Sequence, residues 1–428
     1  MQQLLLVLTV ALCVAAASVS PAWTLAGASS DGKGGKPLAT PVTKDAATSL
    51  YTSPLRGGRP LVLDLSGPLI WTTCGGAHPT LECHHPECAH AHSHHPPGCP
   101  HNGYGVADEE DRFRCKCTAH PHNAITGASA TADLTRVKLS ANATDGGNPL
   151  YPVSFSAVAS CAPGTHLAGL PAGAVGVAGL AGARLALPAQ VARTQRLPGK
   201  FLLCLPRRGA GVAIFGGGPL FIPPPAGLGD LTARLTYTPL LSKKGDPAYY
   251  LPVNGIAVDK ARLPLPGDAL AGGGGGVVLD TKAPYTALRA DVYRQVVDAF
   301  NRTLGRDDAR RPAVAPFELC YDGNRLGPTR IGYLVPDVDL MLEGGKNWTL
   351  TGRSSMVDLP DGPACFAFVK MGGKRRGGYG KGPAPAVVIG GFQMEDNVLQ
   401  FDLEKKQLGF GLTPWFEPCN NFNFTRVQ

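Results

Sequence analysis

The fold is decided by the stretch Leu61-Val62-Leu63-Asp64-Leu65-Ser66-Gly67-Pro68-Leu69-Ile70-Trp71. It reads as a buried strand that ends in an aspartate, a turn of small residues, and a second apolar run closed by a tryptophan. The same order recurs much later, where the apolar run 277–279 leads into Asp280 and another turn. A strand, aspartate and turn that occur once in each half of a chain predict a bilobal fold in which the two carboxylates face each other.

The composition favours a mostly β protein. The chain of 428 residues is long enough for two substantial cores. Its 55 glycines and 39 prolines predict many turns. Helical spacing is scarce and is clearest over 289–300. The net charge of +8 comes from scattered Lys and Arg without a basic helix. This pattern argues against nucleic-acid binding and favours acidic partners or clefts.

Residues 1–26 are typical of a signal peptide and its cleavage region. The apolar run 4–17 has the length of a signal-peptide core and is too short to span a membrane. No other stretch is long and apolar enough to cross a bilayer, so no membrane partner is expected. The sequence therefore predicts a soluble, monomeric, secreted protein.

The cysteines and sequons agree with secretion. Of 12 cysteines, 11 remain once Cys13 leaves with the signal peptide, and in an oxidising compartment they predict a disulfide framework. Because this number is odd, at least one thiol is free or pairs with another chain, and Cys115 or Cys117 is the candidate. Four Asn-X-Thr sequons predict glycosylation, at Asn142, Asn301, Asn347 and Asn423.

Two lobes are expected on either side of a Pro/Gly-rich stretch. The segment 219–229 is the best boundary, which gives an N-terminal lobe over 27–225 and a C-terminal lobe over 226–428. Residues 27–45 are rich in Gly, Ser and Pro and predict a loose lead-in. A Cys/His-rich insertion over 74–117 shows little apolar periodicity and reads as a loop.

Several short motifs resemble, in order along the chain, those of the pepsin-like aspartic peptidases. Each motif is weak by itself, but five in the right order are specific, and they cover nearly the whole mature chain. The resemblance implies an all-β, bilobal pepsin-like fold with a few short helices. The motifs are Asp64 with Trp71, the small-residue run 176–180, Asp280-Thr281, the run 387–391 and the ending 401–410.

A plant branch of this family is more similar still. It contains the secreted endoxylanase inhibitors and the basic seed globulins, which share the peptidase fold but mostly do not cleave peptides. The resemblance implies a place in the apoplast or cell wall, and disulfides that join Cys204 with Cys419 and Cys320 with Cys365. The segments that carry it are 41–51, 61–73, 187–191, 201–206 and 393–396.

The turns after the two aspartates depart from the peptidase pattern. Peptidase chemistry needs two carboxylates that share one proton and activate one water, and in the family each aspartate is followed by Thr-Gly. Here Asp64 is followed by Leu65-Ser66, and Asp280 by Thr281-Lys282. A lysine beside the pair favours the ionised form of both carboxylates. The flap tyrosine is replaced by His122. We therefore expect the catalytic pair to be inactive, its carboxylates left as turn residues that are hydrogen-bonded to nearby amides.

The C-terminal loop is a candidate inhibitor contact. In the related inhibitors this loop inserts a histidine between the two carboxylates of a microbial endoxylanase, and Trp415 holds that position here. Tryptophan cannot form a charge-assisted bond to a carboxylate, but it can stack in a sugar subsite and is a frequent interface anchor. Alternatively, Trp415 and Phe416 pack at the foot of the C-terminal strand. The candidate contacts are Pro414, Trp415 and Phe416.

A basic loop over 370–381 is a second candidate contact, through Lys374 and Arg375. The alternative is a solvated hairpin tip, which is the usual role of such a charge run.

Eight of the 11 histidines lie between His78 and His101, interleaved with cysteines. His and Cys at this density can bind Zn²⁺ or Cu²⁺. The spacing matches no tetrahedral motif, and the related plant proteins have cysteine-rich loops at this place, which favours disulfides. A physiological metal site, adventitious metal binding and a plain polar loop all stay open, and we assign no metal ligand.

The residues and the resemblance together predict a mainly non-proteolytic defence protein that inhibits a microbial glycoside hydrolase, specifically an endo-β-1,4-xylanase. Two alternatives stay open: an active or vestigial aspartic endopeptidase, and a storage or peptide-binding globulin. No cofactor is expected.

Overall fold

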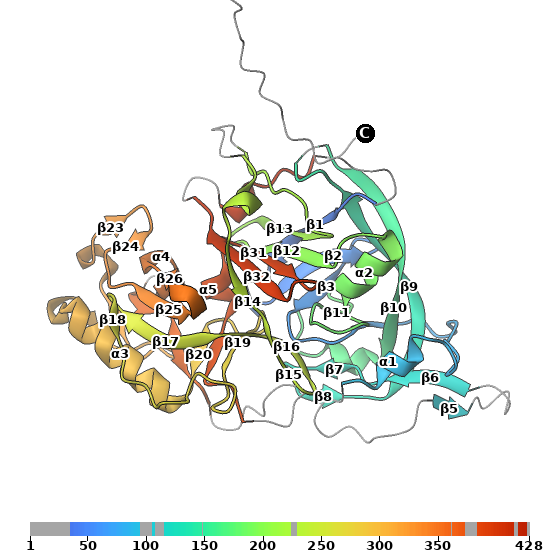
Figure 1. The fold of residues 1–428 in the computed structure, drawn as a ribbon, viewed down its shortest axis with the longest axis horizontal. Coiled ribbons are helices and arrows are strands. Elements are labelled where there is room, and N and C mark those ends of the chain that lie inside the picture. Colours follow the sequence, from blue (N-terminus) through green and yellow to red (C-terminus); the bar gives the residue numbers. More distant parts are fainter. Residues whose placement is uncertain are drawn as a thin grey trace, which may run out of the picture. The chain divides into compact units, whose positions relative to one another are not determined.

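Strands account for most of the secondary structure. The computed structural model describes residues 35–94, 105–107, 115–147, 149–223, 229–360, 362–372, 383–414 and 418–425. Among these residues the largest sheet has 14 strands (Figure 1). Its strands, in spatial order, are β14 (Thr236–Pro239), β32 (Gln407–Leu412), β31 (Asn397–Asp402), β12 (Lys200–Cys204), β13 (Ala210–Phe215), β1 (Leu38–Lys44), β2 (Tyr51–Arg56), β3 (Arg59–Asp64), β11 (Gly176–Gly179), β4 (Ile70–Thr73), β10 (Tyr151–Ala162), β9 (Ala132–Ala143), β6 (Cys115–Ala119) and β5 (Gly105–Ala107).

Smaller sheets follow, most of them in the second half of the chain. A six-stranded sheet has the order β15 (Leu241–Lys243), β16 (Asp246–Leu251), β19 (Val277–Leu279), β30 (Val387–Ile389), β20 (Thr286–Leu288) and β29 (Phe368–Lys370). Two four-stranded sheets are β18 (Ala261–Arg262), β17 (Val253–Val258), β25 (Val338–Leu342), β26 (Asn347–Leu350), and β21 (Arg310–Arg311), β22 (Cys320–Tyr321), β28 (Ala364–Phe366), β27 (Met356–Asp358). Two hairpins are β23 (Pro328–Thr329) with β24 (Gly332–Tyr333), and β7 (His122–Asn123) with β8 (Ala128–Ser129).

Helices are few and short, as predicted. They are α1 (Cys88–Ala91), α2 (Leu187–Gln195), α3 (Ala290–Leu304), α4 (Gly352–Ser355) and α5 (Gly391–Met394). The periodic segment 289–300 forms most of α3, which buries Val292, Val296 and Phe300 and ends at Gly305 in the left-handed conformation. Within the described part of the chain, no helix has the length and apolar character needed to span a membrane.

A three-strand unit occurs once in each half and carries the aspartates. In the first half β3 runs parallel to β11, and β11 is antiparallel to β4. In the second half β19 runs parallel to β30, and β30 is antiparallel to β20. Asp64 is the last residue of β3, and Asp280 directly follows β19. Gly179 and Gly390 permit the tight crossing, because a Cβ at either position would lie 2.3 Å from a facing backbone atom.

The expected loose lead-in over 27–45 is wrong in its second half. Residues 38–44 form β1, which pairs with β13 over six residues and also with β2. Leu38 and Val42 are buried in the main core. The Gly/Ser/Pro composition concealed this strand, because Pro41 reads as a breaker although it lies within the pairing.

Five disulfides link the described residues: Cys74–Cys161, Cys83–Cys115, Cys88–Cys117, Cys204–Cys419 and Cys320–Cys365. The expectation that Cys115 or Cys117 is the unpaired cysteine is therefore wrong. Both lie on β6, and the segment 81–88 runs along that strand and supplies a cysteine to each. The remaining mature cysteine, Cys99, lies outside the described residues.

Candidate functional site

Lys282 bridges the two predicted aspartates. Its ammonium contacts Oδ1 of Asp64 and the hydroxyl of Ser66, and lies 2.9 Å from Oδ1 of Asp280. The backbone amide of Ser66 donates to Asp64 at 2.9 Å, and that of Lys282 donates to Asp280 at 2.8 Å. Asp64 is 5% exposed. The structure thus brings both aspartates into one site and places a cation between them.

Thr281 forms a hydroxyl bridge between the turn after Asp280 and the end of β3. Its hydroxyl donates to the carbonyl of Leu63 at 2.7 Å and accepts from the amide of Leu65 at 3.2 Å. The reciprocal bridge would need a hydroxyl at position 65, which is a leucine here. The bridge that is retained fixes the turn after Asp280 against the end of β3.

The charge of Lys282 is strongly stabilised. Burial by itself lowers the pKa of Lys282, but the charges of Asp280 and Asp64 outweigh this effect and hold the pKa above its ordinary value. A peptidase pair must share one proton, and a glycosidase pair needs one neutral acid. An ammonium in contact with both carboxylates opposes either state. The arrangement suits a salt-bridged structural centre better than acid–base catalysis.

The hairpin β7–β8 supplies His122 at the expected flap position. The carbonyl of His122 accepts a hydrogen bond of 3.2 Å from the indole of Trp71, and its ring lies 2.8 Å from the hydroxyl of Ser129. Burial lowers the pKa of His122, an effect that Asp64 opposes and Lys282 reinforces. The imidazole is therefore neutral at pH 7.

Sequence reasoning missed a second histidine beside this flap. His166 is 6% exposed, and its ring meets that of Trp71 edge-on with centroids 6.2 Å apart. Its carbonyl accepts a hydrogen bond of 2.7 Å from the side chain of Asn123. Burial lowers the pKa of His166. No local motif marks this residue, because its position follows from the packing of the segment 164–167 against the flap.

The C-terminal loop is anchored at both ends by Asp396. The amide of Thr413 donates to the carbonyl of Asp396 at 2.8 Å, and the amide of Cys419 donates to its carboxylate at 3.1 Å. The disulfide to Cys204 fixes the same end. Among the predicted contacts, Pro414 is half-buried. The others lie outside the described residues: Trp415, Phe416, Lys374 and Arg375.

A buried charge network supports this anchor. Asp396 is 1% exposed and pairs with Arg353 and with Arg207, whose Nε lies 3.3 Å away. The neighbouring Glu395 pairs with Lys44 at 2.7 Å. Burial raises the pKa of Glu395, and the Lys44 ammonium opposes this shift. The sequence showed only two adjacent acids after an apolar run, so the network was not predicted.

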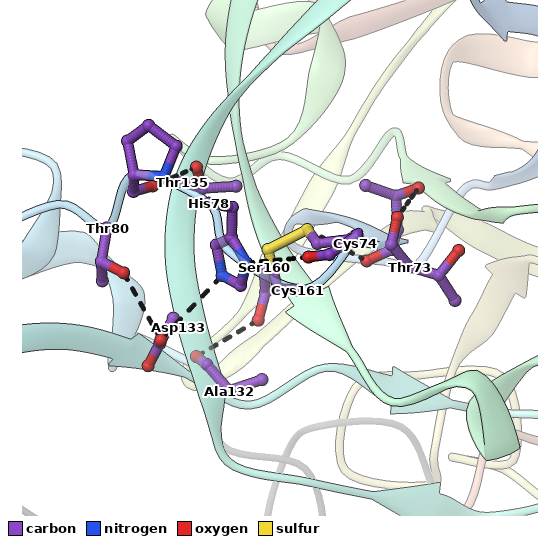
Figure 2. The surroundings of a disulfide bond; sticks show 12 residues. Thr73, Cys74, His78, Thr80, Ala132, Asp133, Thr135, Ser160 and Cys161 are labelled. Atoms are coloured by element: carbon purple, nitrogen blue, oxygen red, sulfur yellow. Dashed lines mark hydrogen bonds and ion pairs between the residues drawn. A yellow bond between two sulfur atoms is a disulfide. The ribbon is translucent and has the colours of Figure 1, made fainter.

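The histidine-rich insertion forms two Cys/His groupings in the part that the structure describes. They are Cys74, His78 and Cys161, and Cys83, His84 and Cys115. In both groupings the cysteines are joined as disulfides, and a metal ligand would have to be a thiolate. Figure 2 shows the first grouping, where His78 lies beside the disulfide and 4.0 Å from Asp133. Each grouping thus offers one histidine and no thiolate.

The four sequons differ in accessibility. Asn142 lies in β9 and is 4% exposed. Asn301 is half-buried, and its side-chain oxygen accepts hydrogen bonds of 2.7 Å from Arg310 and Tyr321. Asn347 and Asn423 are exposed. Glycosylation stays a prediction, and accessibility favours the two exposed sites.

Comparisons with known proteins cover nearly the whole chain. Residues 51–217 match the family model "Xylanase inhibitor N-terminal", and residues 248–411 match "Xylanase inhibitor C-terminal". The chain is 59% identical to Chitinase CLP of Oryza sativa subsp. japonica over 98% of both chains. It is 34% identical to Gamma conglutin 1 of Prunus dulcis, over 90% of this chain and 89% of that protein. The crystal structure of edgp matches with a TM-score of 0.79 and 31% identity, over 91% of this chain and 98% of that one.

Proposed function

The chain belongs to the xylanase-inhibitor family of pepsin-like proteins, and from this membership we propose that it is a secreted, non-proteolytic inhibitor of microbial glycoside hydrolases that acts in plant defence. The five disulfides agree with an oxidising compartment such as the apoplast or cell wall. The partner proposed is an endo-β-1,4-xylanase, bound by a monomer.

The observation that carries the non-proteolytic part is the ammonium of Lys282 in contact with Asp64 and with Asp280. It occupies hydrogen-bonding positions on both carboxylates that peptidase chemistry needs for a shared proton and a water. The Lys282 ammonium thus opposes the shared proton that a peptidase pair needs.

The anchored loop supports the inhibitory part. A contact loop gains affinity when it is ordered before binding, because less conformational entropy is then lost on association. The described residues that flank this loop, Thr413 and Cys419, are both held by Asp396, and Cys419 is also held by a disulfide. We propose that Trp415 and Phe416 present aromatic surface to the target, with Lys374 and Arg375 as a second contact.

The test is inhibition of a purified jelly-roll endoxylanase by the mature chain, with complex formation followed by size-exclusion chromatography. We expect loss of xylanase activity and a co-eluting complex, both weakened in Trp415→Ala. Tyr151→Ala removes another aromatic residue, 44% exposed on β10, and serves as the control that keeps inhibition. Full xylanase activity in the presence of excess wild-type protein contradicts the proposal.

Two catalytic alternatives are tested beside it. Cleavage of a denatured protein at about pH 3 to 5 that is sensitive to pepstatin and lost in Asp64→Asn would show an aspartic peptidase. The second alternative is suggested by the relative named Chitinase CLP. Release of reducing ends from chitin oligosaccharides by the wild type but not by Asp64→Asn would support a glycoside hydrolase. A storage or peptide-binding globulin predicts neither activity nor a xylanase complex.

A further inference from the structure

A cationic cavity lies away from the aspartate pair, in the first half of the chain. Its volume is about 540 Å³, which is within the range of small-molecule sites. Arg56 and Arg59 line it from the β2–β3 hairpin, and Lys138 lines it from β9. The lining contains no carboxylate and no aromatic side chain.

The three cations line one cavity, and no carboxylate in its lining balances their charge. Arg56 and Arg59 face each other in the register of the β2–β3 pair, where like charges repel. Arg56 donates to the backbone carbonyl of Lys138 at 3.2 Å, which places its guanidinium beside the strand that carries Lys138. Within the described part of the chain, none of the three forms an ion pair with a carboxylate, whereas nine other arginines there do. A bound anion would relieve this repulsion.

Hydroxyl groups also line the cavity, beside Leu139 and Val175. Ser140 on β9 and Ser154 on β10 are direct partners across the strand pair, and Thr73 comes from the end of β4. In the described structure the hydroxyls of these three residues form no hydrogen bond with protein groups, so they are available to a ligand that carries several hydroxyls.

One wall of the cavity is fixed in advance. The disulfide Cys74–Cys161 ties the segment after β4 to β10, next to Thr73 (Figure 2). The ring of His78 lies 3.1 Å from the carbonyl of Gly76, which holds the same segment. A prearranged wall lowers the cost of ordering on binding.

We propose that this cavity binds a carboxylated oligosaccharide. Guanidinium groups pair with carboxylates through two parallel hydrogen bonds, and the cavity places two guanidinium groups and an ammonium beside free hydroxyls. A neutral sugar would leave the cations uncompensated and would find no aromatic ring to stack on. An inorganic anion can accept from the cations and the hydroxyls, but it has no ring hydroxyls of its own to donate to the Ser and Thr oxygens. A uronate unit offers a carboxylate to the cations and ring hydroxyls to the Ser and Thr hydroxyls.

The experiment is isothermal titration calorimetry of the mature chain with trigalacturonate. Xylotriose is the neutral comparison ligand, and sodium sulfate is the competitor. The site variant is Arg59→Ala/Lys138→Ala, whose two side chains are exposed. The control variant Arg208→Ala/Lys405→Ala removes the same charge from two exposed positions outside the cavity.

We expect trigalacturonate to bind at one site, about tenfold or more weakly in the site variant, and within about twofold of wild type in the control. Xylotriose should not bind measurably. Equal weakening in both variants would reduce the effect to net charge and overturn the proposal. Displacement by sulfate at concentrations equal to those of the oligosaccharide would reduce the cavity to a simple anion site and overturn it as well. These outcomes are independent of xylanase inhibition.

Discussion

Replacing Lys282 with methionine tests whether the ammonium holds the centre of the fold together. Methionine is close in length and apolar, so the variant loses the contacts to Asp64, Asp280 and Ser66 and leaves two carboxylates facing each other. Removing one member of a buried ion cluster costs about 3 to 5 kcal/mol. We expect a loss of about 3 kcal/mol in the free energy of unfolding at pH 7. This value is at the low end of that range because the Asp280 side chain is 19% exposed.

The loss should shrink at lower pH. Two carboxylates that had shared one ammonium and have now lost it favour uptake of one proton by the folded variant. The folded variant then binds more protons than the unfolded chain, so its stability rises relative to wild type as the pH falls from 7 to 5. Urea unfolding at both pH values measures the difference. The double variant Asp280→Asn/Lys282→Met should recover most of the loss at pH 7.

Lys405→Met is the matched control, because Lys405 is exposed and no carboxylate among the described residues pairs with its ammonium. It should change the free energy of unfolding by less than about 0.5 kcal/mol. A loss below about 1 kcal/mol in Lys282→Met at pH 7, or the same loss at pH 7 and pH 5, would refute the view that the lysine compensates two buried charges.

Three further changes probe the surroundings of this centre. Thr281→Val should cost about 2 kcal/mol in urea unfolding, because two backbone groups lose their hydroxyl partner; an equal loss in Thr281→Ser would contradict this. Acidification from pH 7 to pH 5 should lower wild-type stability in calorimetry. Burial depresses the pKa of His122 and of His166, so below about pH 6.5 the unfolded chain takes up protons that the folded protein does not. If the His166→Asn variant lost stability with falling pH as steeply as wild type, His166 would not contribute to this pH dependence. Cys204→Ser/Cys419→Ser should lower the free energy of unfolding by about 2 to 5 kcal/mol, since the disulfide spans 215 residues. An unchanged urea midpoint would show that the disulfide does not stabilise the fold.

Local patterns in the sequence predicted the centre of the fold. The apolar runs before Asp64 and Asp280, and the small residues after them, are contiguous signals for a strand and a turn, and the two aspartates do meet. The helical spacing that predicted α3 is equally local. The substitution at Lys282 was visible in the motif, although its reach to Asp64 is a tertiary contact that spacing alone does not give.

Several features that depend on distant partners were not predicted. Strand β1 was missed because its pairing with β13 overrides the composition of the segment around Pro41. The unpaired cysteine was misassigned because Cys115 and Cys117 find partners only when the segment 81–88 lies along β6. The network around Asp396 and Glu395 draws on Lys44, Arg207 and Arg353, which lie far apart in the chain, so no window of sequence contains its signal.

The pairing of β12 with β31 limits how this protein can be divided or recombined. Five residue pairs join β12, which belongs to the predicted N-terminal lobe, to β31, which belongs to the predicted C-terminal lobe. If the lobes 27–225 and 226–428 were expressed separately, β12 would become an edge strand whose residues Phe201 to Cys204 are fully apolar, a template for self-association. A chimera that takes one lobe from a relative would keep the fold only if β12 and β31 both came from the same protein. The two halves share the same three-strand unit, but we expect that neither half folds by itself.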